Sequence, residues 1–228
     1  RDRDVTGVQT CALPIFKSIR KFIIFQLTVN ICAMLMAIIG PIFAITTPVT
    51  VIQMLWINMI MDTLAGIAFA SEPPLFEYML EAPKTKDISI INSYMFKEIL
   101  FTGLYTSLLG IFFLKSDFIY NFIRYSSDYR YLYTAYFAFF IFSALFNALN
   151  ARTTRLNILA NITKNKPFIF IFTGITIVQI YLIYFGGDLF RTYGLNGKEL
   201  IFVLLLSLSV IPFDWLRKIL ISKDSKKL

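Results

Sequence analysis

The chain has 228 residues, of which 57% are hydrophobic and 17% aromatic, an apolar share well above that of water-soluble domains. Its net charge of +8 is compatible with nucleic-acid binding, but the charged residues lie at the ends of apolar segments rather than on one basic face. We therefore exclude a soluble domain and a nucleic-acid partner, and we expect a membrane protein that contacts the lipid bilayer.

Residues 1–15, RDRDVTGVQTCALPI, differ in character from the rest of the chain. They are polar, lack helical periodicity and contain Gly7 and Pro14. The segment is too charged, and its apolar part too short, for a signal peptide. We expect a leader that is foreign to the fold or disordered, with the fold itself beginning near Phe16.

Six apolar stretches are long enough to cross a bilayer, which takes roughly 20 residues each. They are residues 22–45, 49–71, 94–115, 132–150, 167–186 and 199–221. The predicted fold class is an all-α membrane protein, a six-helix bundle over residues 16–221, followed by a basic tail at 222–228. Because the number of spans is even, both termini lie on one side of the membrane.

Basic residues predict which side that is, because short loops rich in Lys and Arg stay in the cytoplasm. The side that holds the termini carries, among others, Arg152, Arg155, Lys164 and Lys166, whereas the opposite loops hold few basic residues. We therefore expect a multi-pass protein, of the cell membrane, with both termini in the cytoplasm.

Two connections are longer than the others. Residues 72–93 contain three prolines, which stop the second helix and favour an extended backbone. Residues 116–131, SDFIYNFIRYSSDYRY, are polar and aromatic and are a candidate for a small cap on the outer face.

One acid, Asp62, lies inside the second span. An Asp at the centre of a spanning helix costs about 2.5–3.5 kcal/mol on insertion scales, and such residues usually mark an ion path or an internal pair. No Lys or Arg lies inside the first two spans to pair with it. Asn58 lies one helical turn before Asp62, and Gln26 and Asn30 have the same spacing in the first span.

Counted from the outer turn at about 1.5 Å per residue, Asn30 and Asp62 lie within roughly 3 Å of the same depth. One carboxylate and two amide oxygens could then converge at mid-membrane, which suits a hard cation such as Ca²⁺. The alternative for the amides is hydrogen bonding between helices, which contributes about 0.6 kcal/mol on average. Tyr, Phe and Trp near the helix ends are interpreted as lipid and interface contacts.

The segments SIRKFIIFQLTVNICAM and IQMLWINMIMDTLAGIAFASEPP resemble the fifth and sixth membrane helices of P-type calcium pumps, particularly the plasma-membrane type. FNALNART resembles the end of their eighth helix. The resemblance runs from about Ser18 to the end of the last span and is poor over residues 116–131. It implies that the six spans are helices five to ten of a ten-helix pump.

The resemblance also implies site residues. Asn58 and Asp62 match the Asn and Asp of the sixth helix that bind Ca²⁺ in these pumps, and Asn30 matches the fifth-helix Asn. The chain has Ala33, Met61 and Ala144 where pumps that carry two ions have an acid, a Thr and an acid. The three departures fall on one of the two family sites, so the resemblance implies a single transported Ca²⁺.

The phosphorylation segment D-K-T-G-T and the T-G-E-S segment of the family do not occur in this sequence. The fourth helix, which adds a glutamate and carbonyl oxygens to the retained site in the family, is missing as well. We expect ATP and Mg²⁺ to act only through a missing upstream part of the same polypeptide. The 228-residue chain alone should be inactive, with no catalytic residues of its own.

The leading hypothesis is thus the membrane part of an ATP-driven calcium efflux pump. Two alternatives stay open: a free-standing six-helix cation channel or carrier, and a non-transporting membrane subunit in which Asp62 pairs with a partner. Within the family, a sodium, potassium or proton pump resembles the sixth-span sequence less closely.

Overall fold

The computed structural model describes residues 2–43, 45, 48–73 and 90–225. Over these ranges the backbone forms helices and turns and no β-strand. The elements are α1 (Asp2–Ile42), α2 (Val51–Leu55), η1 (Trp56–Met61), α3 (Asp62–Ala70), α4 (Ser93–Lys115), η3 (Asp117–Asn121), α5 (Arg130–Arg152), η4 (Ile162–Lys164), α6 (Lys166–Phe185), α7 (Gly187–Phe190), α8 (Gly197–Leu208) and α9 (Val210–Ser225). The predicted all-α fold class is confirmed.

The six predicted spans are also confirmed in the described part of the chain. Helical segments long and apolar enough to cross a membrane cover Leu13–Ile42, Val51–Ala70, Ser93–Lys115, Arg130–Arg152, Lys166–Phe185 and Gly197–Leu220. Most boundaries differ from the prediction by one to three residues, and the first span begins nine residues earlier. The protein is therefore a multi-pass membrane protein.

Helix α1 begins before the predicted first span. Residues 2–15, predicted to be foreign or disordered, are helical and run without a break into the first span, with Pro14 inside the helix. Extending an existing helix adds backbone hydrogen bonds without a new nucleation step, so a segment with little periodicity of its own can be helical. The foreign origin of the leader stays a prediction.

Polar side chains set several helix starts. The Thr50 side chain accepts a hydrogen bond from the Gln53 backbone N–H, and the Gln53 side chain accepts one from the Thr50 N–H, which is a capping box. Asn92 caps α4 by accepting from the Met95 N–H at 2.8 Å. These caps satisfy backbone donors that the first helical turn leaves without partners.

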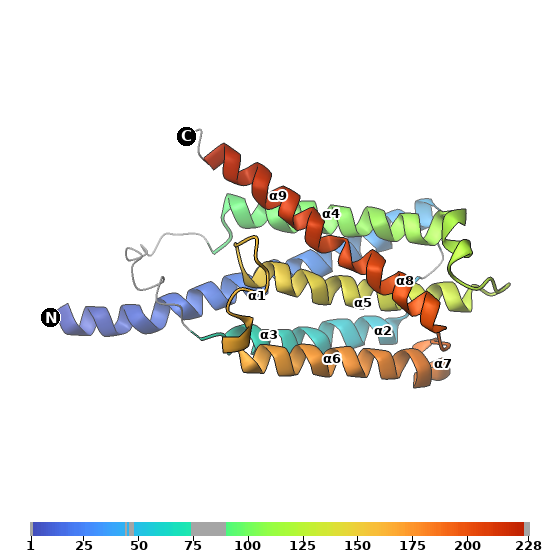
Figure 1. The fold of residues 1–228 in the computed structure, drawn as a ribbon, viewed down its shortest axis with the longest axis horizontal. Helices are drawn as coiled ribbons and strands as arrows, with labels where there is room; N and C mark the ends of the chain where they lie inside the picture. The colour runs from blue at the N-terminus through green and yellow to red at the C-terminus, as the bar shows by residue number, and fades with distance from the viewer. Residues whose placement is uncertain (1, 44, 46–47, 74–89, 226–228) are drawn as a thin grey trace.

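The last span consists of two helices. Helix α8 ends at Leu208 and α9 begins at Val210, and Pro212 lies in the first turn of α9. A proline has no backbone N–H to donate to the residue four positions earlier, so the helical ladder is interrupted here. Helices α8 and α9 together run diagonally across the bundle (Figure 1).

Helix α5 forms the centre of the bundle and contacts α1, α4, α6, α8 and α9. Its apolar side chains, such as Phe137, Phe139 and Ile141, are fully buried. In Figure 1, α4 lies on one side of α5 and the α2–α3 segment with α6 on the other, while both termini emerge at the same end. The expected side of the membrane for the termini stays a prediction.

A buried group of charges joins α9 to α4 and α5 at the end that holds the termini. Arg217 bonds Asp214 at 2.6 Å and Glu98 of α4 at 3.1 Å. Lys218 bonds Asp214 at 2.7 Å and donates to the Thr153 carbonyl, just after α5, at 2.8 Å. Since burying charges is costly unless they are paired, these contacts tie the three helices together.

The connection at 116–131 packs onto the other end of the bundle. Ile119 and Ile123 are buried. Arg124 bonds Glu199 of α8 at 2.8 Å, and this hydrogen bond raises the pKa of Arg124. In the connection at 72–93, residues 74–89 lie outside the described residues, so its predicted extended backbone is untested there. The predicted tail at 222–228 includes the helical end of α9, to Ser225.

Candidate functional site

Asp62 is a buried acid at the start of α3, within the second span. Only 4% of its surface is exposed. Its Oδ2 accepts a hydrogen bond from Nε2 of Gln26 in α1 at 3.3 Å. Among the described residues, its other oxygen, Oδ1, is buried and has no hydrogen-bond partner. A carboxylate held this way in a membrane span has a lone-pair face available for a further ligand.

A turn of π-helix precedes Asp62. Residues Trp56–Met61 form this turn, and the Asp62 N–H donates to the carbonyl of Ile57, five residues earlier. A π-turn inserts one extra residue into an α-helix and is frequently found at functional sites. It points some backbone carbonyl groups away from their α-helical direction. It also changes the angle around the helix axis between Asn58, which lies on the turn, and Asp62.

Asn58 and Asn30 do not join Asp62 through hydrogen bonds. Both side chains are exposed, and the hydrogen bonds of the described residues include none from either amide to the carboxylate. The structure instead brings Gln26 to Asp62. The spacing of Gln26 from Asn30 marks it in the sequence as a polar residue of the same helical face, but the predicted ligand set of Asn58, Asp62 and Asn30 does not include it.

Over the residues that the structure describes, no group of three or more His, Cys, Asp or Glu side chains is placed to hold a metal ion. Any cation here would need amide or carbonyl oxygens beside the single carboxylate of Asp62, which is a ligand set that Ca²⁺ accepts.

A second polar cluster lies between α1, α4 and α5. It includes Thr28, Thr106, Ser143 and Asn147, all buried. The cavity that they line measures about 10 Å³, the lower limit for one water molecule. Ala144, where two-ion relatives of the resembled pumps have an acid, also lines it. This cluster has no room and no carboxylate for a second cation.

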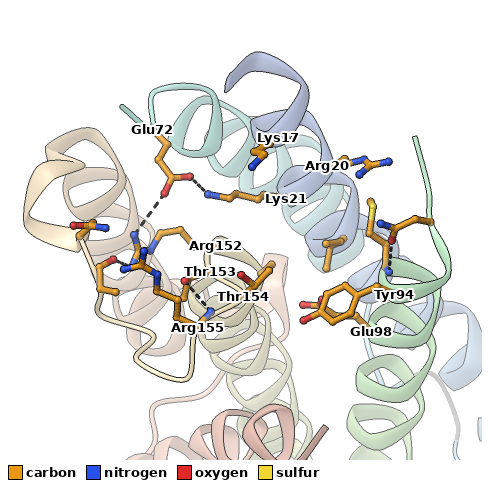
Figure 2. Close-up of a pocket in the computed structure, with 16 residues that line it drawn as sticks. Lys17, Arg20, Lys21, Glu72, Tyr94, Glu98, Arg152, Thr153, Thr154 and Arg155 are labelled. Atoms are coloured by element: carbon orange, nitrogen blue, oxygen red, sulfur yellow. Dashed lines mark hydrogen bonds and ion pairs between the residues drawn. The ribbon is translucent and has the colours of Figure 1, made fainter. Parts of the chain in front are cut away.

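A larger cavity of about 230 Å³ opens at the end of the bundle that holds the termini (Figure 2). Five basic residues line it with Glu72 and Glu98; they are Lys17, Arg20, Lys21, Arg152 and Arg155. Glu72 bonds Lys21 and lies 3.6 Å from Arg152, so it links the end of the second span to α1 and α5. The surplus of positive charge is concentrated at this end.

Comparison with known proteins gives a consistent result. A family model described as "Cation transporting ATPase, C-terminus" matches residues 46–220. The rice (Oryza sativa subsp. japonica) protein "Probable calcium-transporting ATPase 6, plasma membrane-type" is 34% identical over 210 residues, covering 91% of this chain and 20% of the rice protein.

Two animal proteins are similar to the same extent. "Plasma membrane calcium-transporting ATPase mca-1" of Caenorhabditis elegans is 32% identical over 94% of this chain and 18% of its own length. "Plasma membrane calcium-transporting ATPase 1" of Mus musculus is 32% identical over 86% of this chain and 17% of its own length. The chain thus spans about a fifth of the length of the curated relatives that it matches.

Proposed function

We propose that this chain, which belongs to the family of cation-transporting ATPase C-terminal regions, is the membrane part of an ATP-driven calcium efflux pump. In this proposal it supplies ligands for one transported Ca²⁺. The relatives that it matches are named as calcium-transporting ATPases, and they support calcium as the ion.

The observation that carries the proposal is the carboxylate of Asp62. It is buried within a membrane span, one oxygen is held by Gln26, and the other has no hydrogen-bond partner among the described residues. Keeping such a group for packing alone is expensive in a membrane. A cation that enters from water and is released on the other side explains why the acid is there.

Asn58 and Asn30 complete the proposed ligand set with Asp62. Their exposed amides lie on the two helices that carry Gln26 and Asp62, where a further helix can pack against them. Under the resemblance, the upstream part of the polypeptide provides that helix, with its own oxygen ligands. The same upstream part would bind ATP and Mg²⁺ and take up the phosphate.

Transport requires two states that bind the ion with different affinity. The π-turn at Trp56–Met61 supports such a change, because closing it to an α-turn rotates Asn58 relative to Asp62. Phosphorylation upstream would favour the state with the weaker ligand arrangement, and Ca²⁺ would leave on the outer side.

The proposed location is the cell membrane, with both termini in the cytoplasm. The basic cavity of Figure 2 supports this orientation, since it collects Lys and Arg at the end where the chain termini lie, and basic residues favour the cytoplasmic side.

The test is calcium uptake into inside-out vesicles by a full-length pump made by joining this chain to the upstream part of a relative. Asp62→Asn keeps the size of the side chain but removes its charge, and we expect it to abolish ATP-dependent uptake. Asp128→Asn changes an acid with a half-exposed side chain in the 116–131 connection and should leave uptake intact. Undiminished uptake in Asp62→Asn would refute the assignment of the site.

A further inference from the structure

Four tyrosines gather around one cavity at the end of the bundle opposite to the termini. Tyr120, Tyr125, Tyr129 and Tyr133 line a cavity of about 530 Å³. The backbone that carries them is the α4–α5 connection and the start of α5, at the end of the bundle away from the termini (Figure 1). Successive ring centroids are 5.9, 6.3 and 6.4 Å apart, and each pair meets edge to face. The rings therefore form a continuous aromatic wall.

The cavity also carries one charge of each sign. Lys115 ends α4 and Asp117 begins η3 two residues later, and both line the cavity with the tyrosines. Apolar side chains complete the lining, among them Leu114 and Leu132. The site thus combines an aromatic wall, a balanced pair of charges and an apolar base where α4 ends.

The pKa of Tyr120 reflects its neighbours in the cavity. Burial raises the pKa of Tyr120, and the hydroxyls of Tyr129 and Tyr125 and the carboxylate of Asp117 raise it further. The tyrosines and Asp117 line the same cavity, where the carboxylate of Asp117 can attract a positive group.

Cations already lie on tyrosine rings in this part of the molecule. The guanidinium of Arg124 lies 4.0 Å from the ring centre of Tyr131, and that of Arg191 lies 4.6 Å from that of Tyr133. For Tyr120, Tyr125 and Tyr129, no such cation contact occurs with the described residues. Three rings of the wall are thus available to a cation that is not part of the chain.

Aromatic residues at the membrane surface commonly serve as simple interface anchors, and the sequence pattern was interpreted in that way. Anchors of that kind point singly into the headgroup region. Here the rings pack on one another around a shared cavity with an acid and a base at its edge, and aromatic walls of this kind recognise quaternary ammonium groups.

We propose that this cavity binds the phosphocholine headgroup of a membrane lipid. The trimethylammonium group lies against Tyr125 and Tyr129 near Asp117, the phosphate lies toward Lys115, and the acyl chains follow the apolar base into the bilayer. The proposal assigns a role to the 116–131 connection and is independent of calcium transport, because it uses none of the residues of the Asp62 site.

The test compares two lipids that differ only in methylation of the amine. The 228-residue chain is placed in nanodiscs with equal amounts of phosphatidylcholine and phosphatidylethanolamine, and the lipids it retains are counted by native mass spectrometry. We expect about fivefold enrichment of phosphatidylcholine, in line with a cation–π contact. Equal retention of the two lipids would overturn the proposal.

Variants separate the cavity from a general effect of aromatic residues. Tyr125→Leu and Asp117→Asn should abolish the enrichment, whereas Tyr125→Phe, which keeps the ring, should retain it. The control, Tyr181→Leu, removes an exposed tyrosine of α6 outside the cavity and should change nothing. Enrichment that survives Tyr125→Leu, or that Tyr181→Leu also abolishes, would contradict the assignment.

A soluble headgroup could present the same chemistry. In nanodiscs of phosphatidylethanolamine alone, free phosphocholine should compete poorly with added phosphatidylcholine, because it lacks the acyl chains that the apolar base contacts. Free phosphocholine binding as tightly as the lipid would overturn the lipid assignment. Circular dichroism of each variant confirms that helix content is unchanged.

Discussion

Gln26 of α1 donates a hydrogen bond from Nε2 to Oδ2 of Asp62, 3.3 Å away on the neighbouring span. This contact orients the carboxylate, because it holds Oδ2 and leaves Oδ1 without a hydrogen-bond partner among the described residues. We therefore expect Gln26 to orient the carboxylate of Asp62 and not to bind the ion itself.

The first prediction concerns this contact. Gln26→Leu should weaken the apparent calcium affinity of the joined full-length pump by about tenfold, since a hydrogen bond to a charged group contributes about 1.5–3 kcal/mol. The measurement is the calcium concentration that gives half-maximal ATP hydrolysis. Gln179→Leu is the matched control: Gln179 is buried in α6 and its amide has no hydrogen bond with the described residues. An unchanged affinity in Gln26→Leu would show that Asp62 needs no such support.

A second prediction addresses the π-turn. Deleting Met59, whose side chain is exposed, should convert Trp56–Met61 to ordinary α-helix, because it removes the one extra residue that the π-turn accommodates. The register of Asn58 to Asp62 and the directions of the carbonyl groups of the turn would then change. We expect loss of calcium uptake with unchanged helix content by circular dichroism. Met59→Ala, which keeps the residue count, should retain uptake. Normal uptake by the deletion variant would mean that the turn has no part in the site.

The buried charges near the termini give a third prediction. Arg217→Met leaves Glu98 and Asp214 without the cation that they share, and it should lower the free energy of unfolding by about 3–5 kcal/mol. The measurement is unfolding of the detergent-solubilised chain at increasing concentrations of a denaturing detergent. The control is Arg130→Gln, which breaks an ion pair with Asp128 whose side chains are 43% and 50% exposed; it should cost about 1 kcal/mol or less. Equal effects of the two variants would argue against the role given to the buried group.

Close packing of α1 on α4 gives a fourth prediction. A Cβ atom on Gly103 would lie 3.0 Å from Cγ2 of Ile31, so Gly103→Ala should destabilise the chain by about 1–3 kcal/mol. Adding Ile31→Ala should recover part of the loss, because the two residues are in contact. Gly174→Ala, with nothing within 4 Å of the new atom, should be neutral or stabilising. The same unfolding assay measures all three variants, and additive effects at 31 and 103 would count against the contact.

The fold was largely predictable because membrane spans need long apolar runs, and the polar residues that end them, such as Thr50 and Asn92, also cap the helices. The helical leader was not predictable, since α1 extends through residues with little periodicity and through Pro14. Helix extension depends on the neighbouring span and not on the local pattern alone.

The candidate site was predictable only in part. Asp62 stands out by the cost of a charge in a membrane, but its hydrogen-bond partner depends on the relative depth of two helices. The predicted depths of Asn30 and Asp62 assume an α-helical rise for every residue from the outer turn. In the structure a π-turn precedes Asp62, and α1 ends at Ile42. Asn30 and Gln26 lie one helical turn apart, so a depth error of one turn exchanges one for the other as the neighbour of Asp62. No sequence pattern marks a π-turn.

Helix α5 is surrounded by protein on nearly all sides, and this has a consequence for any motion of the bundle. A helix at the rim can tilt by exchanging one lipid neighbour for another, but α5 would have to separate side chains that interlock with five other helices. Displacements during an ion-carrying cycle should then occur in the α1 and α2–α3 layer, with α5 as the stationary axis. Spin labels on α5 and α9 should keep a constant separation while labels on α3 move.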